Sequence, residues 1–313
     1  MSGFVRQHTT VNDFSSSDSW VILSPIEQSI KRKIEAVGTP LKDWDINIYR
    51  GVLTGYNEAF IIDTKKRDEI LANCSSDEER KKTAELIRPI LRGRDIKRYC
   101  YEWAGLWLIC TFPSRHYDIE EYPTVKNYLL SYGKERLEQT GQTYKINGET
   151  IKARKKTSNK WFEVQDSIAY WEDFDRPKIV YPETTVGRSE FCYEENGIFL
   201  DKTCFFICGT NLKYLQGILT SKVVEWYLER QCRLLGKRSI QYSKQWIEQL
   251  PIPTICNYTS REIITLVDQI VSAPKDNPNV NTKDFLDKID ILVCQLYGLT
   301  DDEKRTIGFV EKK

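Results

Sequence analysis

Histidine is scarce in this chain of 313 residues, which contains only His8 and His116. Hydrolases with a serine or cysteine nucleophile need a general base beside it, and that base is most often histidine. His8 falls in a polar N-terminal stretch, whereas His116 follows Arg115 in a segment typical of a surface turn. The sequence therefore argues against a histidine-dependent hydrolase.

Closely spaced cysteine pairs are missing too. The nine cysteines are irregularly spaced, no Cys-x-x-Cys occurs, and the closest pair, Cys204 and Cys208, lies in the apolar run CFFICG. Structural zinc sites need four ligands that come in close pairs. We therefore expect reduced, mostly buried thiols and no metal site in this chain.

Long apolar runs are also absent. No segment approaches the ~20 apolar residues that a membrane-spanning helix requires, and residues 1–19 are polar and rich in serine, without an apolar signal region. Hydrophobic residues make up 40% of the chain and aromatic residues 12%, which is typical of folded proteins. The composition predicts a soluble, cytoplasmic protein with an N-terminal tail or linker.

The chain has almost no surplus of charge, because 46 Lys and Arg residues stand against 45 Asp and Glu residues. Neutralised phosphates supply much of a protein's affinity for DNA, but the charges here are segregated along the sequence. Arg92–Arg98, Lys145–Lys160 and Arg230–Lys244 hold 4, 6 and 5 basic residues against 1, 1 and 0 acids. A neutral protein with such basic faces is compatible with DNA binding.

The motifs of a methyltransferase active site are missing. An adenine methyltransferase uses an Asn-Pro-Pro-Tyr type motif to hold the amino group of a flipped adenine. This chain has no Pro-Pro pair, and its only Asn-Pro pair, Asn277-Pro278, continues into another asparagine. Gly51 and Gly55 bracket GVLTG, which indicates a turn more than a cofactor loop. We expect no methyl transfer by this chain alone.

A magnesium nuclease is an alternative interpretation. The apolar segment AFIIDTK contains Asp63-x-Lys65, and Asp45 lies upstream. Such a nuclease holds its metal with a carboxylate pair and uses a nearby lysine to assist the attacking water. Asp63 also suits the N-cap of a helix that begins at Thr64, and we favour that role.

Apolar periodicity and turn residues predict an α+β protein. A helix with Pro25 in its first turn is expected to end at Gly38. The segment 140–159 is expected to form an extended loop or a hairpin. Further helices are expected over 64–90 in two pieces, over 120–139, over 211–231 and after Pro253. Capping boxes are expected at 75–78, 259–262 and 300–303. Strands are expected twice within 46–63, and at 107–110, 178–181, 191–193, 198–200 and 204–207.

Five segments stand in a specific order: GVLTGYNEAFIID, IRPILRGRDIKRY, RPKIVYPE, LQGILTSKVVEWYL with KQWIEQLPIP, and KIDILVCQLYGLT. In this order they resemble the target-recognition (specificity) domain of type IIG restriction–modification enzymes and adenine-specific DNA methyltransferases, the TaqI-type C-terminal specificity domain. The resemblance covers most of residues 42–310. It implies a mixed-sheet recognition domain over residues 20–255 and a helical C-terminal region over 256–313.

The resemblance implies that this chain recognises a sequence in double-stranded DNA and directs adenine-N6 methylation by a domain that it does not contain. That methyltransferase domain, in cis or as a separate subunit, flips the adenine, and some family members also carry a nuclease domain. No catalytic motif and no cofactor are expected in this chain, whereas the full-length enzyme is expected to use S-adenosylmethionine and magnesium. The chain is expected to be either a fragment of such an enzyme or a separate specificity subunit.

Residues that contact DNA are predicted here from charge and local sequence. Arginine forks suit guanine edges and lysines suit phosphates, and YRGVLTGYN, LRGRDIKRY, KARKKTSNKW, TTVGRSEF and LLGKRSIQYSKQW combine these residues with glycines or aromatics. Asp95 is an alternative partner that would hold Arg92 or Arg94 internally. A module that docks another protein of a multisubunit assembly is a further interpretation. The predicted DNA-binding residues are Arg92, Arg94, Lys97, Lys155, Lys156, Arg188, Lys237, Arg238 and Lys244.

Overall fold

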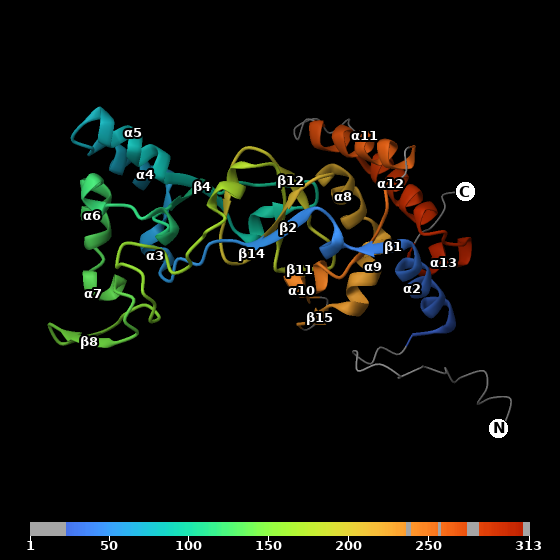
Figure 1. Ribbon diagram of the computed structural model, residues 1–313, viewed down its shortest axis with the longest axis horizontal. Coiled ribbons are helices and arrows are strands. Elements are labelled where there is room, and N and C mark those ends of the chain that lie inside the picture. The colour runs from blue at the N-terminus through green and yellow to red at the C-terminus, as the bar shows by residue number, and fades with distance from the viewer. Residues whose placement is uncertain (1–22, 236–238, 256–257, 274–281, 309–313) are drawn as a thin grey trace, which may run out of the picture.

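The computed structural model describes residues 23–235, 239–255, 258–273 and 282–308. The chain forms an elongated molecule whose two ends are joined by a central sheet (Figure 1). Each end has its own buried hydrophobic cluster: the first core includes Ile30 and Leu215, and the second core includes Phe60 and Leu108. The predicted tail over residues 1–19 lies outside the described residues.

A four-stranded antiparallel sheet in the order β12-β10-β14-β2 separates the two cores. Successive side chains of a strand point to opposite faces of a sheet. On β10, Ile179 and Tyr181 belong to the first core and Val180 belongs to the second. Because both faces are covered, β10 is buried along its whole length. The strands are β2 (Ile46–Arg50), β10 (Lys178–Pro182), β12 (Cys192–Glu194) and β14 (Cys204–Gly209).

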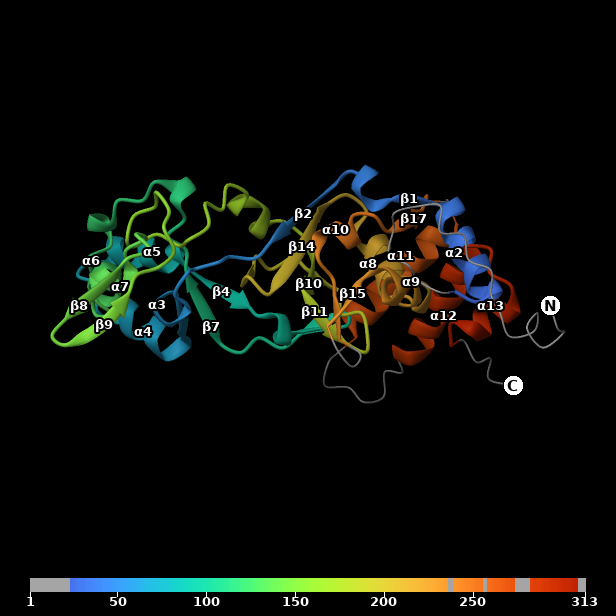
Figure 2. The same ribbon diagram turned by 90° about the horizontal axis from the view of Figure 1, so that it is seen from below.

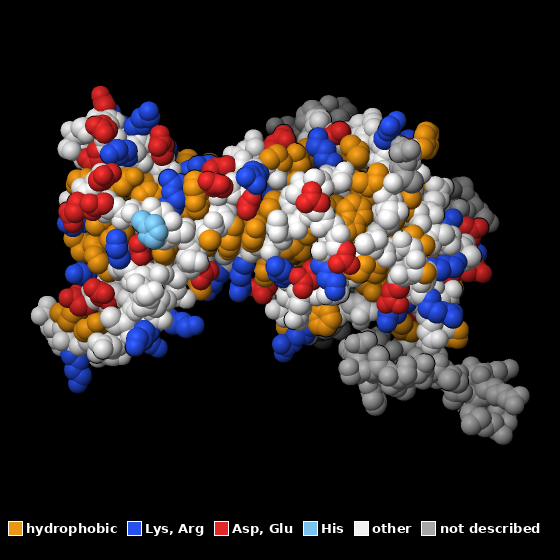
Figure 3. All heavy atoms as spheres, in the orientation of Figure 1, with side chains coloured by type: hydrophobic (Ala, Val, Ile, Leu, Met, Phe, Trp, Pro, Cys, Tyr) orange, Lys and Arg blue, Asp and Glu red, His pale blue; other side chains and the backbone are white. Residues whose placement is uncertain are grey.

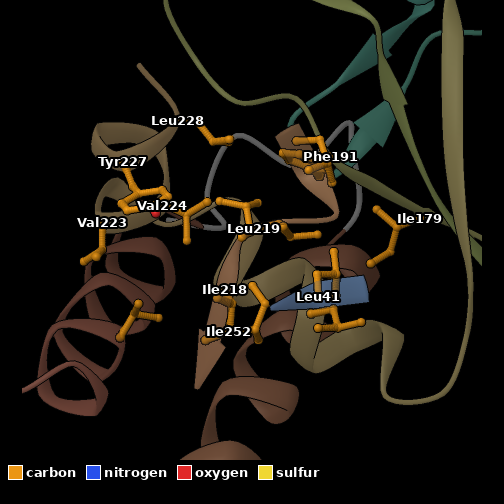
Figure 4. Close-up of a cluster of buried hydrophobic side chains, with 14 of the residues drawn as sticks. Leu41, Ile179, Phe191, Ile218, Leu219, Val223, Val224, Tyr227, Leu228 and Ile252 are labelled. Carbon is orange, nitrogen blue, oxygen red and sulfur yellow. The ribbon is translucent and has the colours of Figure 1, made fainter. Parts of the chain in front are cut away.

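Helices surround the first core at one end of the molecule, on the right in Figure 1. Figure 4 shows Leu219 and Val224, from consecutive helices, close together in this core. The C-terminal helices share it: α8 and α11 approach so closely that a Cβ on Gly217 would lie 2.5 Å from Cγ2 of Ile263. The elements are α2 (Pro25–Val37), α8 (Leu212–Leu219), α9 (Lys222–Gln231), α10 (Lys244–Ile247), α11 (Thr259–Ser272), α12 (Thr282–Leu296) and α13 (Asp301–Thr306), with the paired strands β1 (Gly38–Pro40) and β17 (Pro251–Pro253).

A second sheet, in the order β13-β4-β7-β3, supports the other end of the molecule. The segment expected to be an extended loop or hairpin forms a hairpin of β8 and β9 that extends from this end (Figure 2). Its turn residues Asn147 and Gly148 both have positive φ angles, 50° and 84°. The strands are β3 (Ile61–Asp63), β4 (Ile87–Leu91), β7 (Leu106–Ile109), β8 (Thr143–Ile146), β9 (Glu149–Lys152) and β13 (Phe199–Leu200). The helices are α3 (Asn57–Phe60), α4 (Thr64–Ala72), α5 (Asp77–Leu86), α6 (Pro123–Leu130) and α7 (Lys134–Leu137).

A small three-stranded antiparallel sheet, which we call the outer ribbon, lies beside the central sheet. It consists of β11 (Thr184–Val186), β16 (Ser239–Gln241) and β15 (Arg233–Leu234), in that order. A two-stranded hairpin of β5 (Ile96–Lys97) and β6 (Cys100–Tyr101) completes the strands. Short 3-10 helices are η1 (Leu41–Asp43), η2 (Gly93–Asp95), η3 (Pro113–Arg115), η4 (Ile119–Glu121) and η5 (Trp171–Asp175).

The predicted α+β class is confirmed, but two predicted helices are each divided in two. Within 211–231, Oγ of Ser221 accepts a hydrogen bond from N of Val224 (3.3 Å) and starts a new helix. Within 120–139, the chain turns at Gly133, whose φ angle is 87°. A polar cap and a left-handed glycine therefore override the continuous apolar periodicity.

The two strands predicted within 46–63 are confirmed as β2 and β3, but they join different sheets because α3 redirects the chain between them. One prediction is wrong for a reason of tertiary pairing. Residues 87–90, the end of the helical stretch expected over 64–90, instead belong to strand β4 (Ile87–Leu91), which pairs with β7 and β13. Their apolar side chains are mostly buried, and an apolar run of this length fits a buried strand as well as a helix.

The predicted capping boxes have three different outcomes. The box at Thr300 and Glu303 is confirmed. The box expected at 75–78 does not form: the N-cap is Ser76, whose Oγ accepts a hydrogen bond from N of Glu79 (3.1 Å), while the carboxylate of Glu79 accepts from N of Ser75 (2.8 Å). The box expected at Thr259 is wrong, because Thr259 is already the first residue of α11.

Candidate nucleic-acid interface

Strands β2 and β10 end, and β14 begins, at one edge of the central sheet, which we call the basic edge. A Cβ on Gly51 would lie 2.0 Å from the carbonyl oxygen of Asp201, so only glycine permits this approach. The loop at Gly93 reaches the same edge, because its N–H donates a hydrogen bond to Oγ1 of Thr203 (2.9 Å). These glycines therefore bring two arginine-bearing loops together.

Arg50 is an exposed cation at the basic edge. Its Nη2 donates to Oε2 of Glu183 (2.9 Å) and its Nε to the carbonyl oxygen of Lys202 (2.9 Å). The other carboxylate oxygen of Glu183 accepts a hydrogen bond from Nε2 of Gln241 (3.3 Å) on the outer ribbon. Glu183 thus connects the basic edge to the outer ribbon. The sequence pointed to the segment YRGVLTGYN but did not single out Arg50.

The alternatives for the segment RGRDIKR are resolved by the geometry of Asp95. Asp95 binds Arg92 through two hydrogen bonds, Nη2 to Oδ1 (2.7 Å) and Nε to Oδ2 (2.9 Å). Burial alone would raise the pKa of Asp95, but the hydrogen bonds and charge of Arg92 lower it. Arg94 stays exposed, and Nζ of Lys97 donates to its carbonyl oxygen (2.8 Å). Arg92 therefore stabilises the loop, and Arg94 is presented to solvent.

The basic segment that follows β9 also combines one arginine bound within the fold with neighbouring cations exposed to solvent. Arg154 is buried, and its guanidinium donates to the carbonyl oxygens of Leu137 (2.8 Å), Thr54 (2.8 Å) and Trp161 (2.7 Å). Burial lowers the pKa of Arg154 to about 10. The following Lys155 and Lys156 are exposed. The internal arginine fixes the segment from which the two lysines project.

The charges of Arg50, on the central sheet, and of Lys155, after β9, both act on Asp166. Burial is the largest effect on the pKa of Asp166 and raises it, while the charges of Arg50 and Lys155 act in the opposite direction. Figure 3 shows a hollow along the lower edge of the molecule, between its two ends, with Lys and Arg side chains on both sides and acidic side chains among them. The basic edge and the Lys155 segment therefore border a common region.

Two of the remaining predicted residues, Arg188 and Lys244, lie on or near the outer ribbon. Arg188 is exposed and follows Gly187, whose φ angle of 84° turns the chain after β11. Lys244 is exposed in the first turn of α10. Lys237 and Arg238 lie outside the described residues. In the described part of the chain, no carboxylate is bonded to the side chains of Arg94, Lys155, Lys156, Arg188 and Lys244.

The three residues of the nuclease interpretation do not assemble. Asp63 caps α4, because its Oδ1 accepts a hydrogen bond from N of Lys66 (2.7 Å). Asp45 precedes β2 near the first core, and its carbonyl oxygen binds N of Thr210 (3.1 Å). Lys65 is exposed on α4. Across the described ranges, no group of three or more His, Cys, Asp or Glu side chains is placed to hold a metal ion.

Two further expectations concern cysteines and membranes. The eight cysteines within the described residues are free thiols, and all but Cys100 are buried. Burial raises the pKa of the Cys232 thiol to about 12. As far as the structure describes the chain, no helix has the length and apolar character to span a membrane.

Comparison with known proteins gives a match to one family model and to several solved structures. Residues 88–252, a little more than half of the chain, match the model of the TaqI-like C-terminal specificity domain. The type II methyltransferase M.PaeR7I of Pseudomonas aeruginosa is 21% identical over 319 residues, which cover 98% of this chain and 47% of that protein. The chain therefore spans about half the length of this curated relative.

Two restriction–modification enzymes share the fold. The type IIL enzyme MmeI, solved in complex with DNA, aligns with a TM-score of 0.58 and 15% identity over 87% of this chain and 35% of the MmeI chain. The type IIG restriction endonuclease BpuSI aligns with a TM-score of 0.50 and 15% identity over 87% of this chain and 32% of its own. At this identity the likeness concerns the fold alone.

Proposed function

This chain belongs to the family of TaqI-like C-terminal specificity domains, and from that premise we propose that it recognises a specific sequence in double-stranded DNA for a methyltransferase domain. The observation that carries the proposal is the extent of the match over residues 88–252. This range contains β10 and β14 of the basic edge, the Lys155 segment and the outer ribbon. The exposed cations Arg94, Lys155, Lys156, Arg188 and Lys244 therefore lie within the matched range, whereas Arg50 lies before it.

The charge distribution supports binding of a duplex. Phosphate contacts by Lys and Arg supply most of the sequence-independent affinity for DNA. Exposed cations without a carboxylate salt bridge remain available to phosphates, and among the described residues Lys155, Lys156 and Arg94 are of this kind. The hollow between the two ends (Figure 3) has cations on both sides, as expected for a surface that follows a curved, negatively charged helix.

Catalysis is assigned to a part that this chain does not contain. We place adenine-N6 methylation, S-adenosylmethionine and magnesium in a full-length enzyme, either in cis or in a separate subunit, and we leave cleavage to a nuclease domain where one is present. Such an enzyme acts on cellular DNA, so we place the protein in the cytoplasm. Within the chain, recognition is the role that the free cations and the family fold support.

The proposal is tested by selecting bound duplexes from a pool of randomised DNA with the full chain. We expect enrichment of one sequence and an affinity for it about 10³-fold higher than for random DNA, as for other specific DNA-binding proteins. The affinity is expected to fall steeply with salt concentration. Absence of any enriched sequence, with affinity independent of salt, would reject the proposed function.

A further inference from the structure

The solvent face of the outer ribbon carries one strongly exposed apolar side chain. Val186 is 74% exposed, although it lies within a strand. On the opposite face of the same sheet, Thr185 and Ile240 are buried at 2% and 4% exposure. The alternation of β11, exposed–buried–exposed, therefore places Thr184 and Val186 together on the outer face.

Strand register fixes which side chains stand next to one another on this face. Thr184 pairs with Gln241, and Gln241 pairs with Arg233 on the other side, so three side chains form one row across the ribbon. Val186 pairs with Ser239 in a second row. The two rows contain a guanidinium, an amide, two hydroxyls and a branched apolar group, and no carboxylate.

These groups match the chemistry of base edges in the DNA major groove. Arginine binds O6 and N7 of guanine, glutamine binds N6 and N7 of adenine, and apolar groups contact the methyl group of thymine. The guanidinium of Arg233 has no partner among the described residues, whereas Gln241 donates one amide hydrogen to Glu183 (3.3 Å). That bond orients the Gln241 amide and leaves its oxygen and second hydrogen for a ligand.

The dimensions of the face also suit the groove. Three adjacent strands at ~4.8 Å spacing are ~10 Å wide, and the major groove is ~12 Å wide. Two rows separated by two residues along a strand are ~6.8 Å apart, close to two base-pair steps of ~3.4 Å. The face continues into the basic edge through Glu183, which binds both Gln241 and Arg50.

We propose that the outer face of the ribbon, through Arg233, Gln241 and Val186, reads base edges in the major groove. The inference rests on the proposed function and deepens it by naming the reading element. Arg188, beyond the turn at Gly187, is placed to contact the phosphate backbone that borders the same groove. Specificity then resides in the ribbon, and general affinity resides in the flanking cations.

The test uses the duplex that the wild-type chain selects. Arg233→Lys keeps the charge but loses the two-pronged guanidinium, and Gln241→Ala loses the amide. Each is expected to lower affinity for the selected duplex by about 10- to 100-fold and to relax one base position, with affinity for random DNA unchanged. The matched controls are Arg261→Lys and Gln295→Ala, on exposed positions of α11 and α12, which are expected to retain wild-type preference.

Val186 is tested with a modified base. Replacing thymines of the selected duplex by deoxyuracil removes the methyl group, and we expect a few-fold loss of affinity for the wild-type chain. The Val186→Ala variant is expected to bind the thymine and uracil duplexes equally. Val37→Ala, at an exposed position at the end of α2, is expected to distinguish them as the wild type does.

The outcomes separate the inference from the proposed function. A wild-type chain that selects no sequence overturns both. A wild-type chain that selects a sequence, together with ribbon variants that keep the same preference and affinity, overturns the inference alone. Unchanged DNA preference with lost binding to the methyltransferase polypeptide would also overturn it and would assign this face to protein docking.

Discussion

At the scale of single residues, pairing separates the cations that hold the fold from those that face solvent. Arg92 is bound by Asp95, whereas Arg94 two residues later is exposed. Arg154 is buried and donates hydrogen bonds to three carbonyl oxygens, whereas Lys155 beside it is exposed. In both segments an internal arginine fixes the backbone from which a free cation projects.

This division predicts opposite effects for two neighbouring substitutions. Arg92→Ala leaves the buried carboxylate of Asp95 without its partner, so we expect a loss of about 2 kcal/mol in the free energy of unfolding. Arg94→Ala is expected to leave stability unchanged and to weaken DNA binding. Urea denaturation and a DNA titration of each variant measure both quantities. Equal stability of the two variants would contradict the assigned roles.

At the scale of elements, Glu79 joins the start of α5 to the start of α6. Its carboxylate accepts hydrogen bonds from N and Oγ of Ser75 (2.8 and 2.7 Å) and from N and Oγ1 of Thr124 (3.0 and 2.8 Å). Burial alone would raise the pKa of Glu79, but these hydrogen bonds lower it to about 2. The two helices therefore depend on an ionised carboxylate.

A depressed pKa in the folded state makes this contribution dependent on pH. The stabilisation is fully present above the ordinary pKa of 4.5 and is lost as pH falls toward about 2. Glu79→Gln is expected to cost about 2 kcal/mol at neutral pH, with a difference from wild type that shrinks below pH 4.5. Thermal unfolding of the wild type and the variant across pH 2–7 measures this difference in stability. Glu78→Gln, at an exposed carboxylate on the same helix, is the control and is expected to show little difference at any pH.

Local signals predicted elements well where the deciding contacts are local. Pro25, the hairpin between 140 and 159 and the capping box at Thr300 follow from short-range chemistry, and all three are found in the structure. The break at Ser221 was missed, because apolar periodicity continues across it and N of Lys222 donates to Oδ1 of Asp290 (2.8 Å), a residue distant in sequence. Strand β4 was missed because its partners β7 and β13 are distant in sequence.

At the scale of the whole molecule, the two ends present cations toward one hollow (Figure 3). Lys155→Ala combined with Lys156→Ala removes two exposed charges from the segment that follows β9. We expect weaker binding to all duplexes alike and a salt dependence reduced by about two phosphate contacts. Fluorescence anisotropy at several salt concentrations measures both.

A matched pair elsewhere on the surface controls for net charge. Lys65 and Lys81 are exposed on α4 and α5, at the opposite edge of the same end (Figure 1). Lys65→Ala combined with Lys81→Ala is expected to leave affinity and its salt dependence close to wild type. If both pairs weaken binding equally, total charge and not the hollow governs the interaction.

The sequence by itself determined the α+β class, the family and the basic segments, because composition, periodicity and motif order are properties of the linear chain. Only the tertiary structure decided which cations are free. Asp95 is adjacent to Arg94 and three residues from Arg92 in the sequence, and in the folded chain its carboxylate binds Arg92. The outer ribbon was decided in the same way, since β11 and β16 are about fifty residues apart and only their register places Thr184 beside Gln241. Long-range pairing fixes such neighbours, and no local pattern encodes it.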